Sequence, residues 1–448
     1  MNNLYQKVIW ENRTPTANSL QLLTYLDTTT TDSLIMNGHV IAQNGHSTQN
    51  GHISQNGQSS QNGHSSRNGH SSQNGTVMKL FTPGPLETTI SVREALLTDY
   101  GSRSDEMISI IKFIREKLVV FAGVTEDVYT CVPIQGSGTF AVEAVMNTTT
   151  DKKNSRVLII DNGRYGERME VMCNYMGVEF HGMREPESKP VTGETVRKFL
   201  EQDNNWDIVT IVHSETTTGV LNHVVDVGKV VKEICPDALY IVDSMSSFGA
   251  IELDLEAGLV DFMISSANKC VEGVPGFAYT ICRKDSLLKC QGKATSLCFD
   301  LVQQYLGFQK NGMFRFTPPT HCLAAFKQAL IELEEEGGVA NRTKRYKKIH
   351  RALIDGMELL GFEQYIPEST QGCVVTCFKQ PTNKNWDFKE FYQGLIDHGY
   401  VIYAGNTCND CMTFRIGSMG RLTSKDVRQL LECVRKVLHN MAIEIPVM

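Results

Sequence analysis

The chain has 448 residues, of which 41% are hydrophobic, and a formal net charge of −7. A mildly acidic chain without a stripe of basic residues is not expected to bind nucleic acid, and no apolar stretch approaches the ~20 residues that a membrane span needs. The thirteen cysteines are scattered over the chain, and the N-terminus shows no basic stretch followed by an apolar run. Both observations predict reduced thiols in an intracellular protein. We expect a cytoplasmic location, with a mitochondrial one left open. No metal is expected, because Cys408 and Cys411 lack the second pair of ligands that a zinc site requires.

Residues 1–75 differ in composition from the rest of the chain. Within them, residues 37–75 repeat a hexapeptide of the type NGHSSQ, and an Asn-Gly step recurs every six residues from Asn44 to Asn74. A β-helix with this repeat would need an apolar residue in each turn to fill its interior, and the tract has almost none. We therefore expect residues 1–75 to be a disordered, low-complexity leader.

The folded body is expected to begin near Leu80. Residues 105–121 place apolar side chains on one face, which predicts an amphipathic helix. Short runs rich in Val and Ile follow, and they barely alternate between apolar and polar residues, as is typical of strands that are covered on both faces. The expected strands are 128–134, 156–160, 208–212, 238–242, 262–264 and 277–281.

The order of these patterns predicts the fold class. Strands interleaved with helices favour an α/β fold with a mainly parallel sheet flanked by helices. After about Pro319 the pattern changes to helices over 341–360 and 424–441 with shorter strands over 373–378 and 413–416. We expect a large domain over 76–320 and a smaller C-terminal α+β domain over 321–448.

A group of small residues follows the first expected strand. Ser137, Gly138 and Thr139 open a helical pattern, and backbone N–H groups and hydroxyls at a helix N-terminus can bind a phosphate. The same stretch, GSGTFA, also matches the dinucleotide pattern G-x-G-x-x-A, with Asp161 placed where a ribose-binding acid should fall. The motif alone therefore leaves open which phosphate is bound.

Two charged residues follow later strands. Asp243 directly follows the fourth expected strand, where a buried acid is costly unless a cation or hydrogen-bond donors meet it. Lys269 follows the fifth in a tight turn, where desolvation can leave a neutral, nucleophilic amine. A phosphate cradle, a buried acid and such a lysine together indicate pyridoxal 5′-phosphate. Asp243 would keep the pyridine nitrogen protonated, and Lys269 would hold the aldehyde as a Schiff base and move the substrate proton.

At these residues the sequence resembles the class V aminotransferases of fold type I, and within them the 2-aminoethylphosphonate–pyruvate transaminases. The resemblance covers essentially all of residues 79–440 and does not reach residues 1–75. The similar stretches, in chain order, are FTPGPLETT (81–89), QGSGTFAVEAV (135–145), NGRYGERM (162–169), VHSETTTGVLN (212–222), IVDSMSSFG (241–249), ISSANKCVEGVPGFA (264–278), RFTPPTH (315–321) and FRIGSMG (414–420).

The resemblance implies a role for each matching site residue. Ser137, Gly138 and Thr139 would bind the cofactor phosphate, and Thr317 would reach the phosphate of a neighbouring subunit, which implies a homodimer with active sites at the interface. The implied cofactor contacts also include Tyr165 on the ring, Thr216 at the ring hydroxyl and Asn268 beside Lys269. Arg415 would bind the substrate carboxylate, and Arg103 is a candidate for the phosphonate, although it also fits an exposed arginine at a helix start.

The implied reaction is reversible transamination of 2-aminoethylphosphonate and pyruvate to phosphonoacetaldehyde and L-alanine. Three alternatives stay open. The first is another class V enzyme, such as a serine– or alanine–glyoxylate aminotransferase, and the second is a nicotinamide-dependent oxidoreductase that uses GSGTFA and Asp161. The third is a non-catalytic scaffold whose function lies in the NGHSSQ repeats.

Overall fold

A seven-stranded sheet forms the centre of the larger part of the structure, a computed structural model that describes residues 78–408 and 411–447. The sheet order is β2-β8-β7-β6-β5-β3-β4. Strands β4, β3, β5, β6 and β7 are parallel, whereas β8 runs antiparallel to both β7 and β2. The sheet is therefore mainly parallel, as the sequence predicts. The strands are β2 (Tyr129–Gln135), β3 (Arg156–Asp161), β4 (Glu179–Arg184), β5 (Ile208–Val212), β6 (Leu239–Asp243), β7 (Phe262–Ser266) and β8 (Phe277–Arg283).

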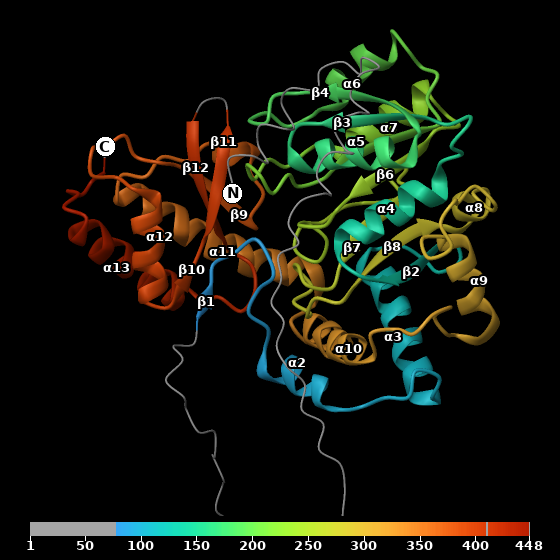
Figure 1. Cartoon of the computed structure of the whole chain (residues 1–448), viewed down its shortest axis with the longest axis horizontal. Coiled ribbons are helices and arrows are strands. Elements are labelled where there is room, and N and C mark those ends of the chain that lie inside the picture. The colour runs from blue at the N-terminus through green and yellow to red at the C-terminus, as the bar shows by residue number, and fades with distance from the viewer. Residues whose placement is uncertain (1–77, 409–410, 448) are drawn as a thin grey trace, which may run out of the picture. The chain divides into compact units, whose positions relative to one another are not determined.

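Helices flank this sheet (Figure 1). Helix α3 (Asp105–Phe121) has the predicted bounds and begins at Ser104, whose side chain accepts a hydrogen bond from the Met107 N–H at 3.2 Å, an N-cap contact. Helix α4 packs on β7 and β8, and α5 packs on β3 and β4. The other helices of this part are α2 (Ile90–Glu94), η2 (Ala95–Leu97), α4 (Gly138–Thr149), α5 (Arg164–Met176), α6 (Gly193–Leu200), α7 (Val224–Ile234), α8 (Lys284–Leu288), α9 (Leu301–Asn311) and α10 (Thr320–Glu335).

The C-terminal part contains a three-stranded antiparallel sheet of order β11-β12-β9. A short strand from the start of the described chain, β1 (Lys79–Leu80), pairs in parallel with β10 (Tyr400–Val401). The other elements are α11 (Gly338–Leu359), η3 (Glu368–Thr370), β9 (Val375–Lys379), α12 (Phe388–Asp397), β11 (Tyr403–Cys408), β12 (Cys411–Gly417) and α13 (Ser424–Asn440).

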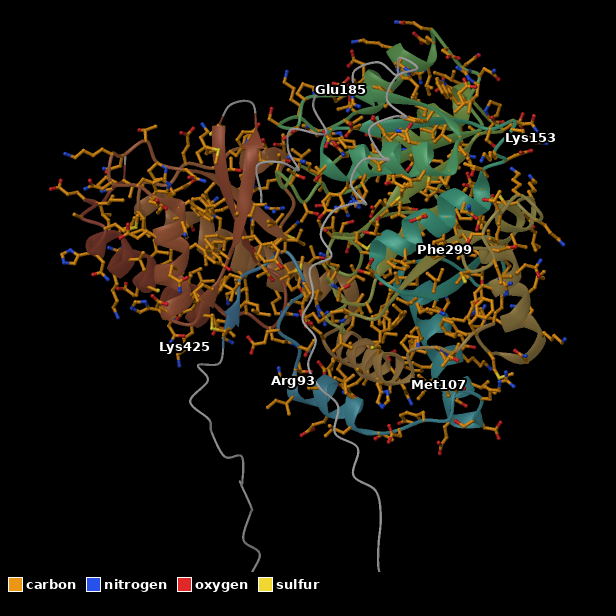
Figure 2. All side chains as sticks on the ribbon, in the orientation of Figure 1. Arg93, Met107, Lys153, Glu185, Phe299 and Lys425 are labelled. Atoms are coloured by element: carbon orange, nitrogen blue, oxygen red, sulfur yellow. The ribbon has the colours of Figure 1, made fainter. Side chains whose placement is uncertain are left out.

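Hydrophobic side chains form separate cores in the two parts. The larger core runs from Val92 to Leu333 and includes the buried face of α10. A second core joins α11, α12 and α13 to the C-terminal sheet and includes Phe81 from the start of the described chain. Figure 2 shows the side chains on the ribbon: Met107 is buried, whereas Lys153 and Lys425 are exposed. Within residues 78–408 and 411–447, no helix has the length and apolar character that a membrane crossing demands.

Strand β4 is the element of the large sheet that the sequence analysis missed. Its residues, Glu179–Arg184, alternate in exposure, and only Met183 is buried. The strand lies at the edge of the sheet and pairs only with β3. An edge strand of this kind has no continuous apolar run for a sequence reading to detect. The expected disordered leader lies outside the described residues.

Candidate active site

Lys269 lies in the turn after β7, close to the first residues of the folded chain. Its Nζ donates a hydrogen bond to the backbone carbonyl of Pro83 at 2.8 Å. Burial lowers the pKa of the amine, a shift that the nearby Asp243 carboxylate partly opposes. A buried amine with a lowered pKa can attack a carbonyl carbon, as the sequence analysis expects of Lys269.

Gly84 makes room for the lysine side chain. It has a φ of +105°, and a Cβ at this position would lie 2.7 Å from both Cδ and Nζ of Lys269. Any other residue would be strained in this conformation and would displace the amine. The loop of Pro83 and Gly84 therefore packs directly against the Lys269 side chain.

Asp243 ends β6, next to the strand that leads to Lys269. It pairs in register with Ile264 of β7, and its side chain is only 3% exposed. Its Oδ1 accepts a hydrogen bond from the Met245 N–H at 2.8 Å. Burial raises the pKa of Asp243 to about 6, although the Met245 N–H and the charges of Arg168 and Lys269 act in the opposite direction. The carboxylate lacks a close cationic partner of its own within the described part of the chain, and a protonated ring nitrogen would supply one.

The N-terminus of α4 forms the third part of the site. Ser137 is its N-cap, and the serine side chain makes no capping hydrogen bond, so its hydroxyl is available to a ligand. A Cβ on Gly138 would lie 2.3 Å from Met245 Sδ, so a side chain at this position would have to displace Met245 in the loop after β6. Thr139 Oγ1 accepts a hydrogen bond from Arg168 Nη1 at 3.2 Å.

One small pocket lies between α4, α5 and the end of β6. Its lining includes Thr139 from α4, Tyr165 and Arg168 from α5, and Asp243 and Met245 from the end of β6. Three residues that the sequence analysis assigned to the cofactor, namely Thr139, Tyr165 and Asp243, thus lie around one space. The Arg168 guanidinium stacks on the Tyr165 ring at 4.9 Å from its centroid.

Thr216 and Arg415 approach the same region from two sides. Thr216 is buried, and its Oγ1 lies 2.9 Å from Ser246 Oγ in the loop after Asp243. Its backbone carbonyl accepts a hydrogen bond from Arg415 Nη1 at 3.1 Å, and Nη2 of the same arginine donates to the Ala404 carbonyl at 3.0 Å. Burial and the nearby Glu215 raise the pKa of Tyr165, while a hydrogen bond with Thr216 and the charge of Arg415 oppose this shift. Arg415 therefore stands beside the pocket.

Three predicted residues lie outside this group. Asn268 directly precedes Lys269 and is half-buried. Thr317 is exposed in the segment between α9 and α10, and Arg103 is exposed just before α3. Neither of these two lines the pocket of Thr139 and Asp243. Thr317 was assigned to the site of a partner subunit, and that assignment stays a prediction, as does the role of Arg103.

Sequence reasoning missed two charged residues of the site. Arg168 lies within the stretch NGRYGERM, three positions after Tyr165 and hence on the same helix face, a spacing that could have identified it. Glu215 is fully buried and accepts hydrogen bonds from the Thr217 N–H at 2.9 Å and the Thr217 hydroxyl at 2.6 Å. Burial raises the pKa of Glu215 to about 7. The stretch VHSETTTG has no pattern that would have predicted the burial of Glu215.

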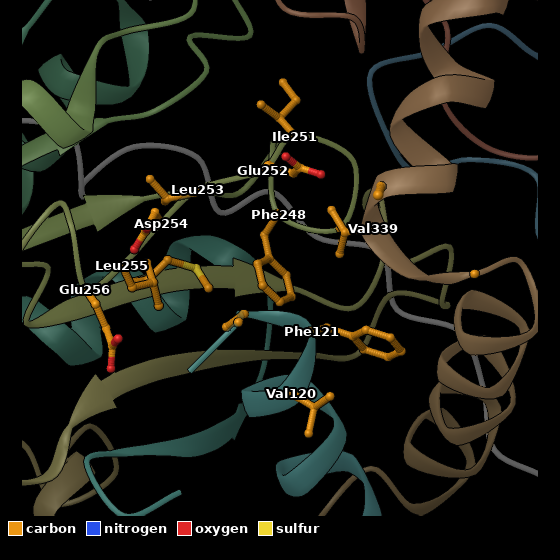
Figure 3. Close-up of a pocket in the computed structure, with 16 residues that line it drawn as sticks. Val120, Phe121, Phe248, Ile251, Glu252, Leu253, Asp254, Leu255, Glu256 and Val339 are labelled. Atoms are coloured by element: carbon orange, nitrogen blue, oxygen red, sulfur yellow. The ribbon is translucent and has the colours of Figure 1, made fainter. Parts of the chain in front are cut away.

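Two other observations bear on the alternatives. Asp161, the acid that a dinucleotide site would use, is buried and forms an ion pair with Arg184 at 2.6 Å. Figure 3 shows a separate pocket lined by side chains such as Phe121, Phe248 and Val339. Its volume is about 480 Å³, and none of the predicted site residues lines it. The Asp161 ion pair favours a structural role for this acid.

Comparison with known proteins identifies the family. The family model described as "Aminotransferase class-V" matches residues 96–430. The chain belongs to the class-V aminotransferases. Enzymes of this family and fold use pyridoxal 5′-phosphate, and the buried amine of Lys269, the buried Asp243 and the helix N-terminus at Ser137 fit this cofactor. The predicted family, fold class, cofactor and transaminase chemistry are confirmed.

Several relatives of this class-V aminotransferase carry one name. The chain is 41% identical over 361 residues to a 2-aminoethylphosphonate–pyruvate transaminase of Syntrophobacter fumaroxidans. The aligned region covers 80% of this chain and 96% of the relative. It is 42% identical to the enzyme of the same name from Vibrio cholerae, over 80% of this chain and 97% of the relative. A bifunctional phosphonoacetaldehyde hydrolase/aminoethylphosphonate transaminase of Clostridioides difficile is 43% identical, and the chain spans only 56% of its length.

Solved structures of lower identity share the fold. Ureidoglycine–glyoxylate aminotransferase from Bacillus subtilis matches with a TM-score of 0.74 at 24% identity, over 82% of this chain and 95% of that one. Pyridoxamine–pyruvate aminotransferase from Mesorhizobium loti matches with a TM-score of 0.75 at 18% identity, over 84% and 95%. These similarities support the fold-type-I architecture that the sequence predicts.

Proposed function

We propose that this aminotransferase catalyses the reversible transfer of an amino group from 2-aminoethylphosphonate to pyruvate, giving phosphonoacetaldehyde and L-alanine. The names of relatives that are 41% and 42% identical support this choice of substrates. The chemistry rests on the position of Lys269. This residue lies in the turn after β7, and β7 pairs with β6, the strand that ends at Asp243. Bound pyridoxal phosphate supplies an electron sink for negative charge that develops on the substrate carbon.

Lys269 moves the proton in this proposal. Burial lowers the pKa of the Lys269 amine and so favours its neutral form, which is the form that can take a proton from the substrate carbon. The same amine would deliver that proton to the C4′ carbon of the cofactor, and with the second substrate it would move a proton in the opposite direction. The hydrogen bond to the Pro83 carbonyl holds Nζ in place when the amine is free, and the Asp243 carboxylate acts on the same amine by raising its pKa.

The remaining residues bind and orient. Asp243 would keep the ring nitrogen protonated, because a buried carboxylate is stabilised by a cation at hydrogen-bond distance. Ser137, Gly138 and Thr139 would hold the phosphate at the N-terminus of α4. Tyr165 would cover the ring, Thr216 would bond its hydroxyl group, and Asn268 would support Lys269 from the adjacent position.

Arg415 is the proposed binding group for the substrate carboxylate. Its guanidinium donates only to backbone carbonyls among the contacts described, so an incoming carboxylate can replace these with stronger, charge-assisted hydrogen bonds. Arg103 stays our candidate for the phosphonate group. Its exposure before α3 suits contact with the site of a second subunit better than contact with the site of its own chain.

We further propose a cytoplasmic homodimer with active sites at the subunit interface, in which Thr317 contacts the phosphate bound by the partner. The exposure of Thr317 supports this arrangement. We also propose a large domain over 76–320 and a small domain over 321–448. The two hydrophobic cores support this division, although α10 belongs with the first core and Phe81 with the second.

An amino-donor screen tests the substrate assignment. The purified enzyme is supplied with pyruvate and one amino donor at a time, and alanine formation is measured. We expect 2-aminoethylphosphonate to give a kcat/KM far above that of serine. Faster reaction of serine or alanine with glyoxylate as acceptor would instead assign the chain to a glyoxylate aminotransferase.

A further inference from the structure

The turn that carries Lys269 is closed by Glu272. The backbone N–H of Glu272 donates to the Lys269 carbonyl at 2.7 Å. Glu272 has a φ of 67°, which is rare for a residue other than glycine, and only 2% of its surface is exposed. A buried carboxylate on a strained backbone persists only where its surroundings compensate for both costs.

Side chains of α11 and of the segment after β12 provide this compensation. Arg345 Nη2 lies 2.8 Å from Glu272 Oε1, and the Tyr346 hydroxyl donates to the same oxygen at 2.7 Å. Arg421 Nε lies 3.0 Å from Oε2. The fully buried Arg342 lies 3.7 Å from Oε2 through its Nη1. Three arginines thus surround one carboxylate.

Arg342 also binds the backbone of the turn. Its Nη1 donates to the Cys270 carbonyl at 2.8 Å, one residue after Lys269. The position of this arginine is fixed in turn by Glu336, whose Oε2 lies 2.8 Å from Arg342 Nε. Burial alone would raise the pKa of Glu336, but its contacts with Arg345 and Arg342 lower it to about 2. The turn is therefore held through its backbone, at the Cys270 carbonyl, and through the side chain of Glu272.

The same cluster reaches the strand of Arg415. The Gly420 N–H donates to the Tyr346 hydroxyl at 2.8 Å, and Arg345 Nη1 donates to the Gly420 carbonyl at 2.5 Å. Gly420 follows shortly after β12, the strand that contains Arg415. Arg345 and Tyr346 consequently connect the lysine turn to the segment that continues from the proposed carboxylate-binding strand.

We propose that Glu272 is a positioning residue, which acts through the turn to hold the Lys269 amine where it meets the cofactor aldehyde and the substrate proton. This inference rests on the proposed function. The arginines of α11 hold Glu272, and Glu272 holds the turn. Its carboxylate does not take part in the chemistry itself.

The variant Glu272→Gln tests the proposal, with Asp261→Asn as its matched control. Asp261 is also a buried carboxylate in an ion pair, with Lys232 at 2.7 Å, but it lies at the opposite end of β7 from Lys269. Both changes remove one buried charge. We expect both variants to lose thermal stability.

Two measurements separate positioning from stability. The first is the rate at which cofactor-free protein captures added pyridoxal phosphate, followed by visible absorbance. The second is kcat against KM in the holoenzyme. We expect Glu272→Gln to lower the capture rate and kcat by about 10- to 100-fold with KM for the amino donor nearly unchanged, because small displacements of a reacting group have effects of this size. Asp261→Asn should leave both within about twofold.

A wild-type capture rate and kcat in folded Glu272→Gln would overturn the proposal and leave Glu272 a purely stabilising role. If that variant does not fold, Arg345→Lys replaces it. This change keeps the charge, but one ammonium cannot reach Glu272, Glu336 and the Gly420 carbonyl together. We expect slower capture in the same direction, and an unchanged rate would likewise overturn the proposal. The capture rate requires no amino donor, so failure of the substrate assignment would appear separately, as wild-type enzyme that forms no alanine.

Discussion

The amine of Lys269 donates a hydrogen bond at 2.8 Å to the carbonyl of Pro83, which lies 186 positions earlier in the chain. The first loop of the described chain therefore helps to build the site of a lysine near its middle. The contact also shows why Gly84 has no side chain, because a Cβ there would meet the lysine at 2.7 Å.

Replacement of Lys269 by alanine removes the proposed proton carrier and the covalent attachment of the cofactor. We expect kcat to fall by at least ~10²- to 10⁴-fold and the visible absorption of the lysine-linked cofactor to disappear. Lys289→Ala, at an exposed lysine at the end of α8, should retain both. A coloured and active Lys269→Ala protein would contradict the assignment.

Gly84→Ala should affect activity more than stability. The new methyl group would displace the flexible end of Lys269, and the φ of +105° would add backbone strain of about 1–3 kcal/mol. Gly292→Ala is the control, since Gly292 has a φ of +85° with no atom within 4 Å of its virtual Cβ. Both variants should lose similar stability in thermal unfolding, and only Gly84→Ala should lose kcat. Equal activity in the two would exclude a role for the space at Gly84.

Asp243 makes the cofactor-free protein less stable at neutral pH. Its pKa rises from 3.8 to about 6 on folding, so the folded state disfavours the charged carboxylate by about 3 kcal/mol. This penalty is fully present above pH 6, decreases as the pH falls through 6, and is absent below 3.8. Cofactor-free Asp243→Asn should therefore unfold at a higher temperature than wild type at pH 7.5.

The difference between these two proteins should vanish near pH 3.8, which thermal unfolding at a series of pH values can follow. With the cofactor bound, the order should reverse, because the wild-type carboxylate then faces a protonated ring nitrogen. A constant difference at every pH would show that the carboxylate is not destabilised by burial.

Arg415→Lys tests the proposed carboxylate contact. A lysine keeps the charge but loses the two parallel N–H donors, so we expect KM for pyruvate to rise by roughly 10-fold with a smaller change in kcat. Arg428→Lys, on the exposed side of α13, should change neither constant. An unchanged KM in Arg415→Lys would move the carboxylate site elsewhere.

The sequence predicts the parts of this molecule that local patterns specify. Helix α3 has the predicted bounds because its apolar spacing and its Ser104 cap lie within one segment. The buried strands agree within about two residues, whereas the half-exposed strand β4 does not show in the sequence. Lys269 and Asp243 could be found because Asp243 ends one buried strand and Lys269 lies in the turn after the next.

Contacts between distant segments could not be predicted in this way. Nothing in the residues around Pro83 indicates that its carbonyl receives the lysine, and nothing near Glu272 indicates that arginines of α11 surround it. Such pairs are fixed by the path of the chain between them. Arg168 could have been predicted only in part. Its spacing from Tyr165 can be seen in the sequence, whereas its contact with Thr139 joins two separate helices.

The pairing of β1 with β10 also has a consequence for the order of synthesis. Lys79 lies opposite Tyr400, and Phe81 is fully buried among residues as late in the chain as Val447. A nascent chain leaving the ribosome exposes this phenylalanine early and can cover it only after the C-terminal segments that pack on it have been made. Protein made without its final helix should therefore be a substrate for chaperones that bind exposed aromatic groups.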